Sequence, residues 1–227
     1  MRRRWVWTMG LLGVAVGLLW QGCSTPTRVT TISQAGFSGS RVGKVGVMPF
    51  FTGRHPSNVN ENLNCTLCTL AFDPESVGTG AASTLTRYVY ELVYARFQDR
   101  VLPQDGVMAS YDAIPQDQER DTPLTVARRV GQASGADYML LGTVWRYRER
   151  SGSSSSSRSP SSVAFDLYLV DVRKGETVWM ANFEETQRSL TDNIWDADTF
   201  FSRGAKWLSA NELARYGVEE IVKQMPL

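Results

Sequence analysis

Two cysteines three positions apart are the residues whose types and spacing most directly suggest chemistry. Cys65 and Cys68 stand in a loop-like, Asn-rich stretch of the chain. Such a pair can form a disulfide, exchange electrons as a dithiol, attach a haem or contribute to a zinc site. A haem would need a histidine directly after Cys68, where Thr69 stands, and a structural zinc ion needs about four ligands. Because the chain has one histidine, His55, and one cysteine outside the pair, a local disulfide is the prediction, with redox chemistry, free thiols or metal binding as the alternatives.

No other set of residues forms a catalytic constellation. General base catalysis by histidine would have to rest on His55 alone. Two carboxylate pairs lie on predicted strands, Asp166 with Asp171 and Glu184 with Glu185. Their odd separations place the two members of each pair on opposite faces of a sheet. The sequence therefore predicts no catalytic residue, no cofactor and no metal site, and a periplasmic hydrolase or C-x-x-C redox protein is the alternative hypothesis.

The third cysteine, Cys23, follows a segment with the layout of a secretory signal peptide. The chain begins with Met1-Arg2-Arg3-Arg4 and continues with 16 uncharged residues from Trp5 to Trp20. A helix needs ~20 apolar residues to span a hydrocarbon core, so this stretch is short for a permanent span. A cationic start, a short apolar middle and small residues at the exit predict a signal peptide over residues 1–22.

The run Leu18-Leu19-Trp20-Gln21-Gly22-Cys23 resembles the lipobox of bacterial lipoproteins, although Trp20 and Gln21 depart from its usual residues. The resemblance implies cleavage before Cys23 and a cysteine that carries acyl chains such as palmitate, which anchor the mature chain to a membrane. Ser24, rather than aspartate, after the cysteine implies the outer membrane of a Gram-negative cell. The alternative is a secreted protein with an incidental cysteine.

Charge and composition limit the classes of partner and the number of domains. Removing residues 1–22 takes away three arginines, so the formal net charge goes from +1 to −2. A near-neutral chain lacks the basic surface that nucleic-acid binding requires. Residues 23–41 are rich in Ser, Thr, Gly and Gln and are predicted to be a flexible, lipidated tether. Residues 42–227 are enough for one domain of ordinary size with its own core.

Hydrophobic periodicity divides residues 42–227 into strands and helices. Short apolar or alternating runs predict strands at residues 44–51, 101–103, 137–145, 163–172 and 176–185. Apolar residues three and four apart predict helices at 85–97, at 124–133 and from a capping box at 209–212 to residue 222. Thr122-Pro123 is typical of a helix start, and Ser134-Gly135 is typical of a helix end.

The order β-α-β-α-β-β-β-α predicts an α/β (α+β) fold with a single mixed sheet and helices packed on it. Strands separated by helices favour parallel neighbours, whereas runs 163–172 and 176–185, joined by Arg173-Lys174-Gly175, are typical of an antiparallel hairpin. Residues 151–162 contain nine serines and are predicted to be a mobile loop. Residues 192–208 are aromatic-rich without a regular period, and we expect them to cover the sheet.

Several segments, in this order, resemble a domain of bacterial envelope proteins. They are VGVMPF at 45–50, the helix end and strand at 96–102, ASGADYMLLGTV at 133–144, and the hairpin at 165–179. These segments resemble the α/β domain of the curli-secretion lipoprotein, of the lipoprotein activators of penicillin-binding proteins, and of the Tol translocation protein at its amino terminus. The resemblance covers residues 42–225 and implies a periplasmic, non-catalytic domain that binds other proteins.

These features together predict a membrane-anchored periplasmic lipoprotein that acts as a non-catalytic protein-binding or accessory module in cell-envelope assembly or secretion. The expected partners are the membrane, through acylated Cys23, and an envelope protein or a second copy of the chain. Neither a nucleic acid nor a small-molecule substrate is expected. The predicted location is the outer membrane, with the domain facing the periplasm and Cys65 and Cys68 joined in a disulfide.

Overall fold

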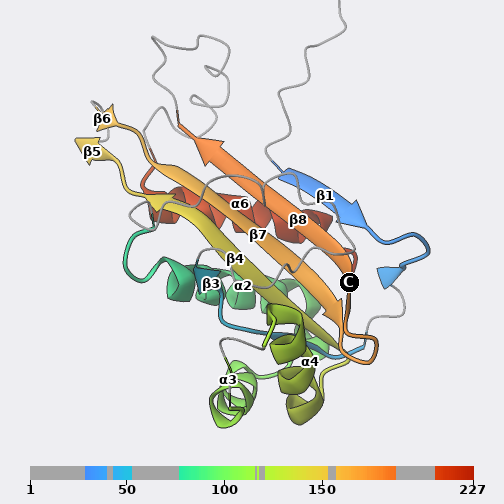
Figure 1. The fold of residues 1–227 in the computed structure, drawn as a ribbon. Coiled ribbons are helices and arrows are strands. Elements are labelled where there is room, and N and C mark those ends of the chain that lie inside the picture. The colour runs from blue at the N-terminus through green and yellow to red at the C-terminus, as the bar shows by residue number, and fades with distance from the viewer. Residues whose placement is uncertain are drawn as a thin grey trace, which may run out of the picture.

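The computed structural model describes residues 29–39, 43–52, 77–115, 117, 121–152, 157–187 and 208–227. The elements are, in chain order, β1 (Val29–Ser33), β2 (Val45–Val47), β3 (Phe51–Thr52), α2 (Ala81–Phe97), the 3-10 helix η3 (Gln98–Arg100), α3 (Gln104–Ala113), α4 (Pro123–Ser134), β4 (Tyr138–Arg148), β5 (Ser151–Gly152), β6 (Ser157–Ser159), β7 (Ser162–Asp171), β8 (Glu176–Thr186) and α6 (Ala210–Gln224). They form an α+β fold around one mixed sheet, as the sequence predicts (Figure 1).

The main sheet has the strand order β1-β8-β7-β4-β2, and β3 also pairs with β4. The pairs β4–β7, β7–β8 and β8–β1 are antiparallel, whereas β2 and β3 are parallel to β4. Helices separate β3 from β4 along the chain, and the parallel pairing confirms the crossover expected from that order. The β7–β8 hairpin is also confirmed, and Gly175 in its turn has φ 72°, a conformation that glycine adopts readily.

Two helices begin where their sequence signals predict. The Thr122 hydroxyl accepts the Thr125 N–H at 3.0 Å and caps α4, which ends at Gly135 with φ 73°. The Ser209 hydroxyl accepts the Glu212 N–H at 3.2 Å, and the Glu212 carboxylate accepts the Ser209 N–H at 2.8 Å. This reciprocal pair is the predicted capping box of α6.

Helices cover both faces of the sheet. In Figure 1, α2 and α6 lie behind it, and α3 and α4 lie in front of its lower end. The α2–α6 side contains the larger core, in which helix residues such as Leu85, Val89, Leu213 and Ile221 pack with Phe165, Leu167, Leu169 and Phe183 of the sheet. The α3–α4 side contains a second core of residues such as Val107, Val126, Val130, Met139, Leu141, Tyr168 and Val170. Strand β7 lies between these layers and is buried at every position.

Two close approaches between helix or strand backbone and an aromatic ring tighten the larger core. A Cβ atom built on Gly217 of α6 would lie 2.6 Å from Cδ1 of Phe183, and one built on Gly142 of β4 would lie 2.2 Å from Cε1 of Phe50. Only glycine allows these rings to approach so closely.

The predicted flexible tether over residues 23–41 is wrong at residues 29–33, which form β1 on the edge of the sheet. Val29 is 4% exposed, and Phe37 lies 6.2 Å from the ring of Tyr138 between centroids. Thr30 and Thr31 are exposed. An edge strand of this kind is held mainly by backbone hydrogen bonds, so its sequence needs few apolar residues.

The predicted mobile loop over residues 151–162 is wrong at both ends. Residues 151–152 and 157–159 form the antiparallel pair β5–β6, and Ser161 and Ser162 are fully buried. The Ser161 hydroxyl contacts Oε1 of Gln187 at 3.1 Å and the carbonyl of Leu208 at 2.9 Å. Serine can be buried because its hydroxyl finds such partners.

Two further features differ from the expectation. Helix α3 was not predicted, because Val107 is its only buried residue and Gly106 weakens its helical pattern. The predicted strand at 101–103 is reduced to one parallel bridge between Val101 and Val45. No helix within the described residues is both long and apolar enough to span a bilayer.

Candidate functional site

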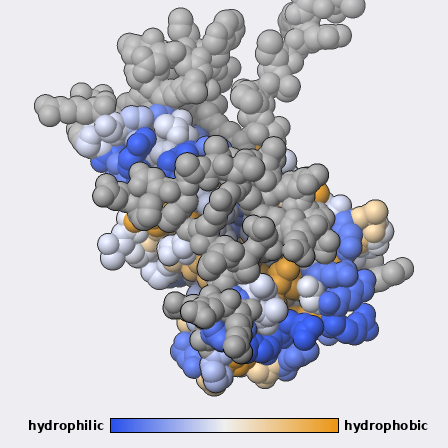
Figure 2. All heavy atoms as spheres, viewed as in Figure 1, coloured by the Kyte–Doolittle hydropathy of each residue, from blue (hydrophilic) through white to orange (hydrophobic). Residues whose placement is uncertain are grey.

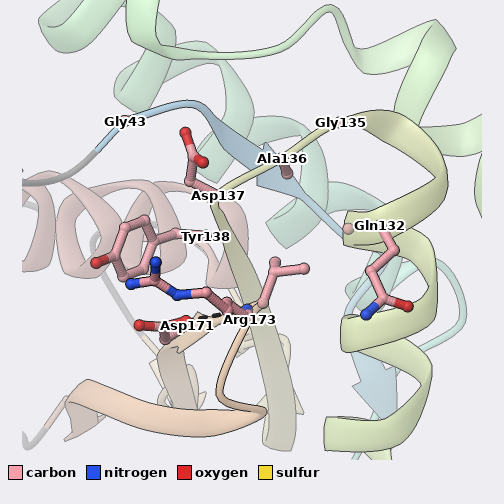
Figure 3. Close-up of a pocket in the computed structure, with 10 residues that line it drawn as sticks. Gly43, Gln132, Gly135, Ala136, Asp137, Tyr138, Asp171 and Arg173 are labelled. Carbon is pink, nitrogen blue, oxygen red and sulfur yellow. Dashed lines mark hydrogen bonds between the residues drawn. The ribbon is translucent and has the colours of Figure 1, made fainter.

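A pocket of about 630 Å³ lies at the end of the sheet where β4 begins and the β7–β8 turn lies. Its wall is formed by the last turn of α4, the α4–β4 connection, the β7–β8 turn and Gly43, which lies just before β2. The lining residues are Gly43, Gly131, Gln132, Gly135, Ala136, Asp137, Tyr138, Asp171, Val172 and Arg173 (Figure 3).

Both carboxylates of the pocket hold backbone groups in place. Oδ2 of Asp137 accepts the Lys44 N–H at 2.7 Å, and Oδ1 of Asp171 accepts the N–H groups of Arg173 and Lys174 at 3.0 Å each. Figure 3 shows Asp137 directed toward Gly43, where an added Cβ would lie 2.0 Å from Oδ2. The two aspartates therefore fix the start of β2 and the β7–β8 turn beside each other.

The electrostatics of the pocket are mixed. Burial raises the pKa of the Tyr138 hydroxyl, and the charge of Asp171 adds to the rise. Arg173 and Gln132 are exposed at the opening, on the β7–β8 turn and on α4. The lining contains neither cysteine, serine nor histidine. The arrangement suits contact with a small polar group.

A second polar cluster surrounds Asp166 on the α3–α4 side of the sheet. Oδ2 of Asp166 accepts the indole N–H of Trp145 at 2.6 Å and the hydroxyl of Tyr168 at 3.0 Å, and Oδ1 accepts the Asn182 amide at 2.6 Å. The Asp166 side chain is fully buried. Burial raises its pKa, although the three hydrogen bonds act in the opposite direction. The cluster links β4, β7 and β8 across the sheet.

The same three strands share an arginine network beyond the Asp166 cluster. Arg146 contacts the Ser162 hydroxyl at 2.5 Å through Nε, and it pairs with Glu184 at 2.8 Å. The hydroxyls of Ser162 and Thr186 lie 2.5 Å apart. This end of the sheet is therefore polar and cross-linked by side chains.

Helix α2 carries a stacked pair of tyrosines and a third tyrosine that two arginines contact. Tyr90 and Tyr94 stack with ring centroids 5.8 Å apart, and Tyr94 is 49% exposed. The guanidinium groups of Arg87 and Arg215 lie 4.6 and 5.5 Å from the ring centroid of Tyr88, which is buried. Among the described residues Tyr94 is the only large apolar side chain that is exposed. Tyrosine and arginine are both enriched at protein-contact surfaces.

The residues predicted to carry chemistry lie mostly outside the described part of the chain. Cys23, Cys65, Cys68 and His55 all belong to residues that the structure does not describe, as does most of segment 192–208. Asp166 lies in the cluster described above, and Asp171 lies at the pocket, so the structure does not bring these two carboxylates together. Within the described residues no three His, Cys, Asp or Glu side chains are grouped as a metal site.

The pocket was not predicted, although its residues carried a partial signal. Gly135-Ala136-Asp137 marks the turn from α4 into β4 and is recognisable in the sequence. Its position beside Arg173 depends on the antiparallel register that places Tyr138 opposite Asp171. That register joins residues far apart in the chain, and a single sequence does not reveal it.

Comparisons with known proteins give low similarities. No protein-family model matches the chain, and no curated protein matches it. The PelC dodecamer from Paraburkholderia phytofirmans is 14% identical, covers 87% of this chain and 96% of that chain, and has a TM-score of 0.47. Lipoprotein GNA1162 from Neisseria meningitidis is 15% identical, covers 72% of this chain and 94% of that chain, and has a TM-score of 0.42.

The carboxy-terminal domain of LpoB from Salmonella enterica is also similar, with 13% identity, 67% and 87% of the two chains covered, and a TM-score of 0.37. Identities and TM-scores of this size do not transfer a function to this chain. The resemblance to the curli-secretion lipoprotein and to the Tol translocation protein stays a prediction from the sequence.

Proposed function

We propose that this chain is a lipoprotein anchored to the outer membrane through acylated Cys23, and that its periplasmic α+β domain is a non-catalytic module that binds another protein in envelope assembly or secretion. The proposal is carried by the order of the first 23 residues. Three arginines, an uncharged apolar stretch and Gly22-Cys23 form a signal peptide with a lipobox-like end.

The described domain supports the binding part of the proposal. Its buried polar groups, including Asp166 and Asp171, contact neighbouring backbone or side-chain donors and thereby hold the fold together. The exposed Tyr94, stacked on Tyr90, provides the kind of surface that anchors protein contacts. We place the protein-binding surface at this tyrosine pair on α2.

The anchor is tested by the mass of the mature amino terminus and by metabolic labelling with an alkyne-bearing palmitate. The wild-type chain should begin at Cys23, carry acyl chains and remain in the membrane fraction. Cys23→Ser should lose the label and the membrane association, whereas the matched variant Ser24→Thr should keep both. An unacylated amino terminus in the wild-type chain would rule out the lipoprotein.

The binding surface is tested by photocrosslinking in the native envelope. A photoreactive residue in place of Tyr94 should give a discrete crosslinked band that a residue in place of exposed Lys174 does not give. Tyr90→Ala should weaken that band because the stacked partner is lost. Equal crosslinking from both positions would show that the tyrosine pair is not the contact surface.

A further inference from the structure

The length of chain between Cys23 and the first strand limits how the domain can be oriented. Val29 is the first residue of β1, and six peptide units separate it from Cys23. A fully extended chain spans at most about 3.3–3.6 Å per residue, so Val29 lies within about 20 Å of Cys23. We propose, on the basis of the proposed acylation of Cys23, that this short link holds the β5–β6 end of the domain against the phospholipid headgroups.

The pairing of β1 shows which end of the sheet this is. Val29 lies opposite Phe183, and β1 continues to Ser33 opposite Trp179, so the chain enters β1 from the end of the sheet where β8 stops. Strand β8 continues for three residues beyond Phe183, the partner of Val29, and ends at Thr186. These three residues span about 10 Å. The sheet therefore overhangs the point where the link is attached.

The β5–β6 pair adds to this overhang. Thr186 pairs with Ser162 of β7, and Ser159 of β6 precedes Ser162 by three residues, which adds up to about 10 Å. Figure 1 shows β5 and β6 at the end of β4 and β7 that is opposite α3 and α4. The overhang of up to about 20 Å is therefore comparable with the full reach of the link. When the strands run along the membrane normal, β5–β6 thus lies at the level of Cys23 and of the headgroups.

The described side chains at this end suit a contact with headgroups. Arg148, Glu149, Ser151 and Ser159 are exposed, and the described residues of this end expose no large apolar side chain. Guanidinium and hydroxyl groups are good donors to phosphate oxygens. The exposed groups that the structure describes at this end therefore suit a polar contact with the surface of the bilayer.

The opposite end of the sheet then faces away from the membrane. Strand β7 runs from Ser162 to Asp171, which separates the two ends by about 30 Å. The pocket with Asp137, Asp171 and Arg173 lies at that far end. This end of the domain therefore lies farthest from the membrane.

The orientation is tested with a donor dye and vesicles of phosphatidylethanolamine and phosphatidylglycerol that carry an acceptor dye on their headgroups. The mature chain with Cys65→Ser and Cys68→Ser is coupled through Cys23 to a maleimide-bearing lipid, and the donor is attached to an azide-bearing residue in place of Ser159 or Lys174. Energy transfer from position 159 should be at least threefold more efficient than from position 174. Equal transfer, or greater transfer from 174, would overturn the orientation.

A longer link tests the cause. Inserting twenty Gly and Ser residues after Thr27 should lower the transfer from position 159 at least twofold, and unchanged transfer would overturn the role of the short link. Chemical coupling makes both results independent of acylation in the cell. An unacylated amino terminus in the cell, together with greater energy transfer from position 159 than from 174 after chemical coupling, would contradict the proposed anchor. That result would leave the orientation geometry intact.

Discussion

The indole N–H of Trp145 and the hydroxyl of Tyr168 meet on the same carboxylate oxygen, Oδ2 of Asp166. The other oxygen accepts the Asn182 amide. One buried acid thus joins donors from β4, β7 and β8, and none of these three donors carries a positive charge. A charged carboxylate is costly to bury in such a place, and this cost raises the pKa of Asp166 in the folded chain, although the three hydrogen bonds act in the opposite direction.

We predict that Asp166→Asn makes the chain less sensitive to pH. The pKa of Asp166 is raised in the folded chain, mainly by burial and to a small extent by the charge of Glu184. The stability that this group contributes is therefore fully present below its unfolded pKa and is lost as the pH rises through its folded pKa. In urea unfolding, the free energy of unfolding of Asp166→Asn should exceed that of the wild type by on the order of 1 kcal/mol at pH 7. The two free energies should be equal near pH 4.

The asparagine keeps one acceptor for Trp145 and Tyr168, and rotation of the Asn182 amide presents an oxygen to the new NH₂ group. Asp166→Ala is the control, because it removes the acceptor of all three donors. It should lower the free energy of unfolding by ~3 kcal/mol or more at every pH. A pH profile of Asp166→Asn that parallels the wild type would contradict the raised pKa.

Gly217→Ala should destabilise the chain by about 1–3 kcal/mol, since the added methyl group would overlap the Phe183 ring. Gly106→Ala is a matched control because Gly106 is also helical and nothing lies within 4 Å of its added Cβ. It should stabilise the chain by up to ~1 kcal/mol through helix propensity. Thermal unfolding of the two variants should shift in opposite directions, and equal shifts would refute the close contact.

Removing β1 should expose the edge of β8. A chain that starts at Gln34 loses the buried Val29 side chain, whose burial is worth about 1.5–3 kcal/mol, together with its backbone pairing. We expect lower stability and concentration-dependent association, because an unpaired edge strand is open to another chain. Light scattering and urea unfolding, compared with a chain that starts at Arg28, measure both effects. A fully stable, monomeric chain from residue 34 would mean that β1 contributes nothing.

We propose that Cys65 and Cys68 form a disulfide that has no redox function. Thiol titration of the unfolded, unreduced protein should find neither thiol free, and prior reduction should release both. Cys65→Ser with Cys68→Ser should lower stability without abolishing photocrosslinking at position 94. A reactive thiol with a depressed pKa would support the redox alternative instead.

Local signals in the sequence predicted the elements whose cause is local. The Thr122 and Ser209 caps, the turn at Gly175 and the strand at 163–172 all depend on residues a few positions apart, and all were confirmed. The element β1 depends on backbone pairing with a strand about 150 residues away, and Thr30 and Thr31 give it no apolar pattern. Its existence was therefore invisible.

The Asp166 cluster and the pocket show the same difference between local signals and long-range packing. The Asp166 cluster needs side chains from three strands in one register, and the sequence showed only that Asp166 lies in an apolar strand. The pocket needs α4 to end beside the β7–β8 turn. Each component was predicted, whereas their proximity arises from tertiary packing that periodicity does not encode.

The pairing of β1 with β8 also constrains the order of folding. Val29 is the first residue of the sheet, yet its partner Phe183 is made about 150 residues later. Closing so long a loop is slow, and the β7–β8 hairpin can form by itself beforehand. The first strand to be synthesised is therefore expected to be the last to join the sheet, and a nascent chain has to wait with an open β8 edge until its own amino terminus returns to cover it.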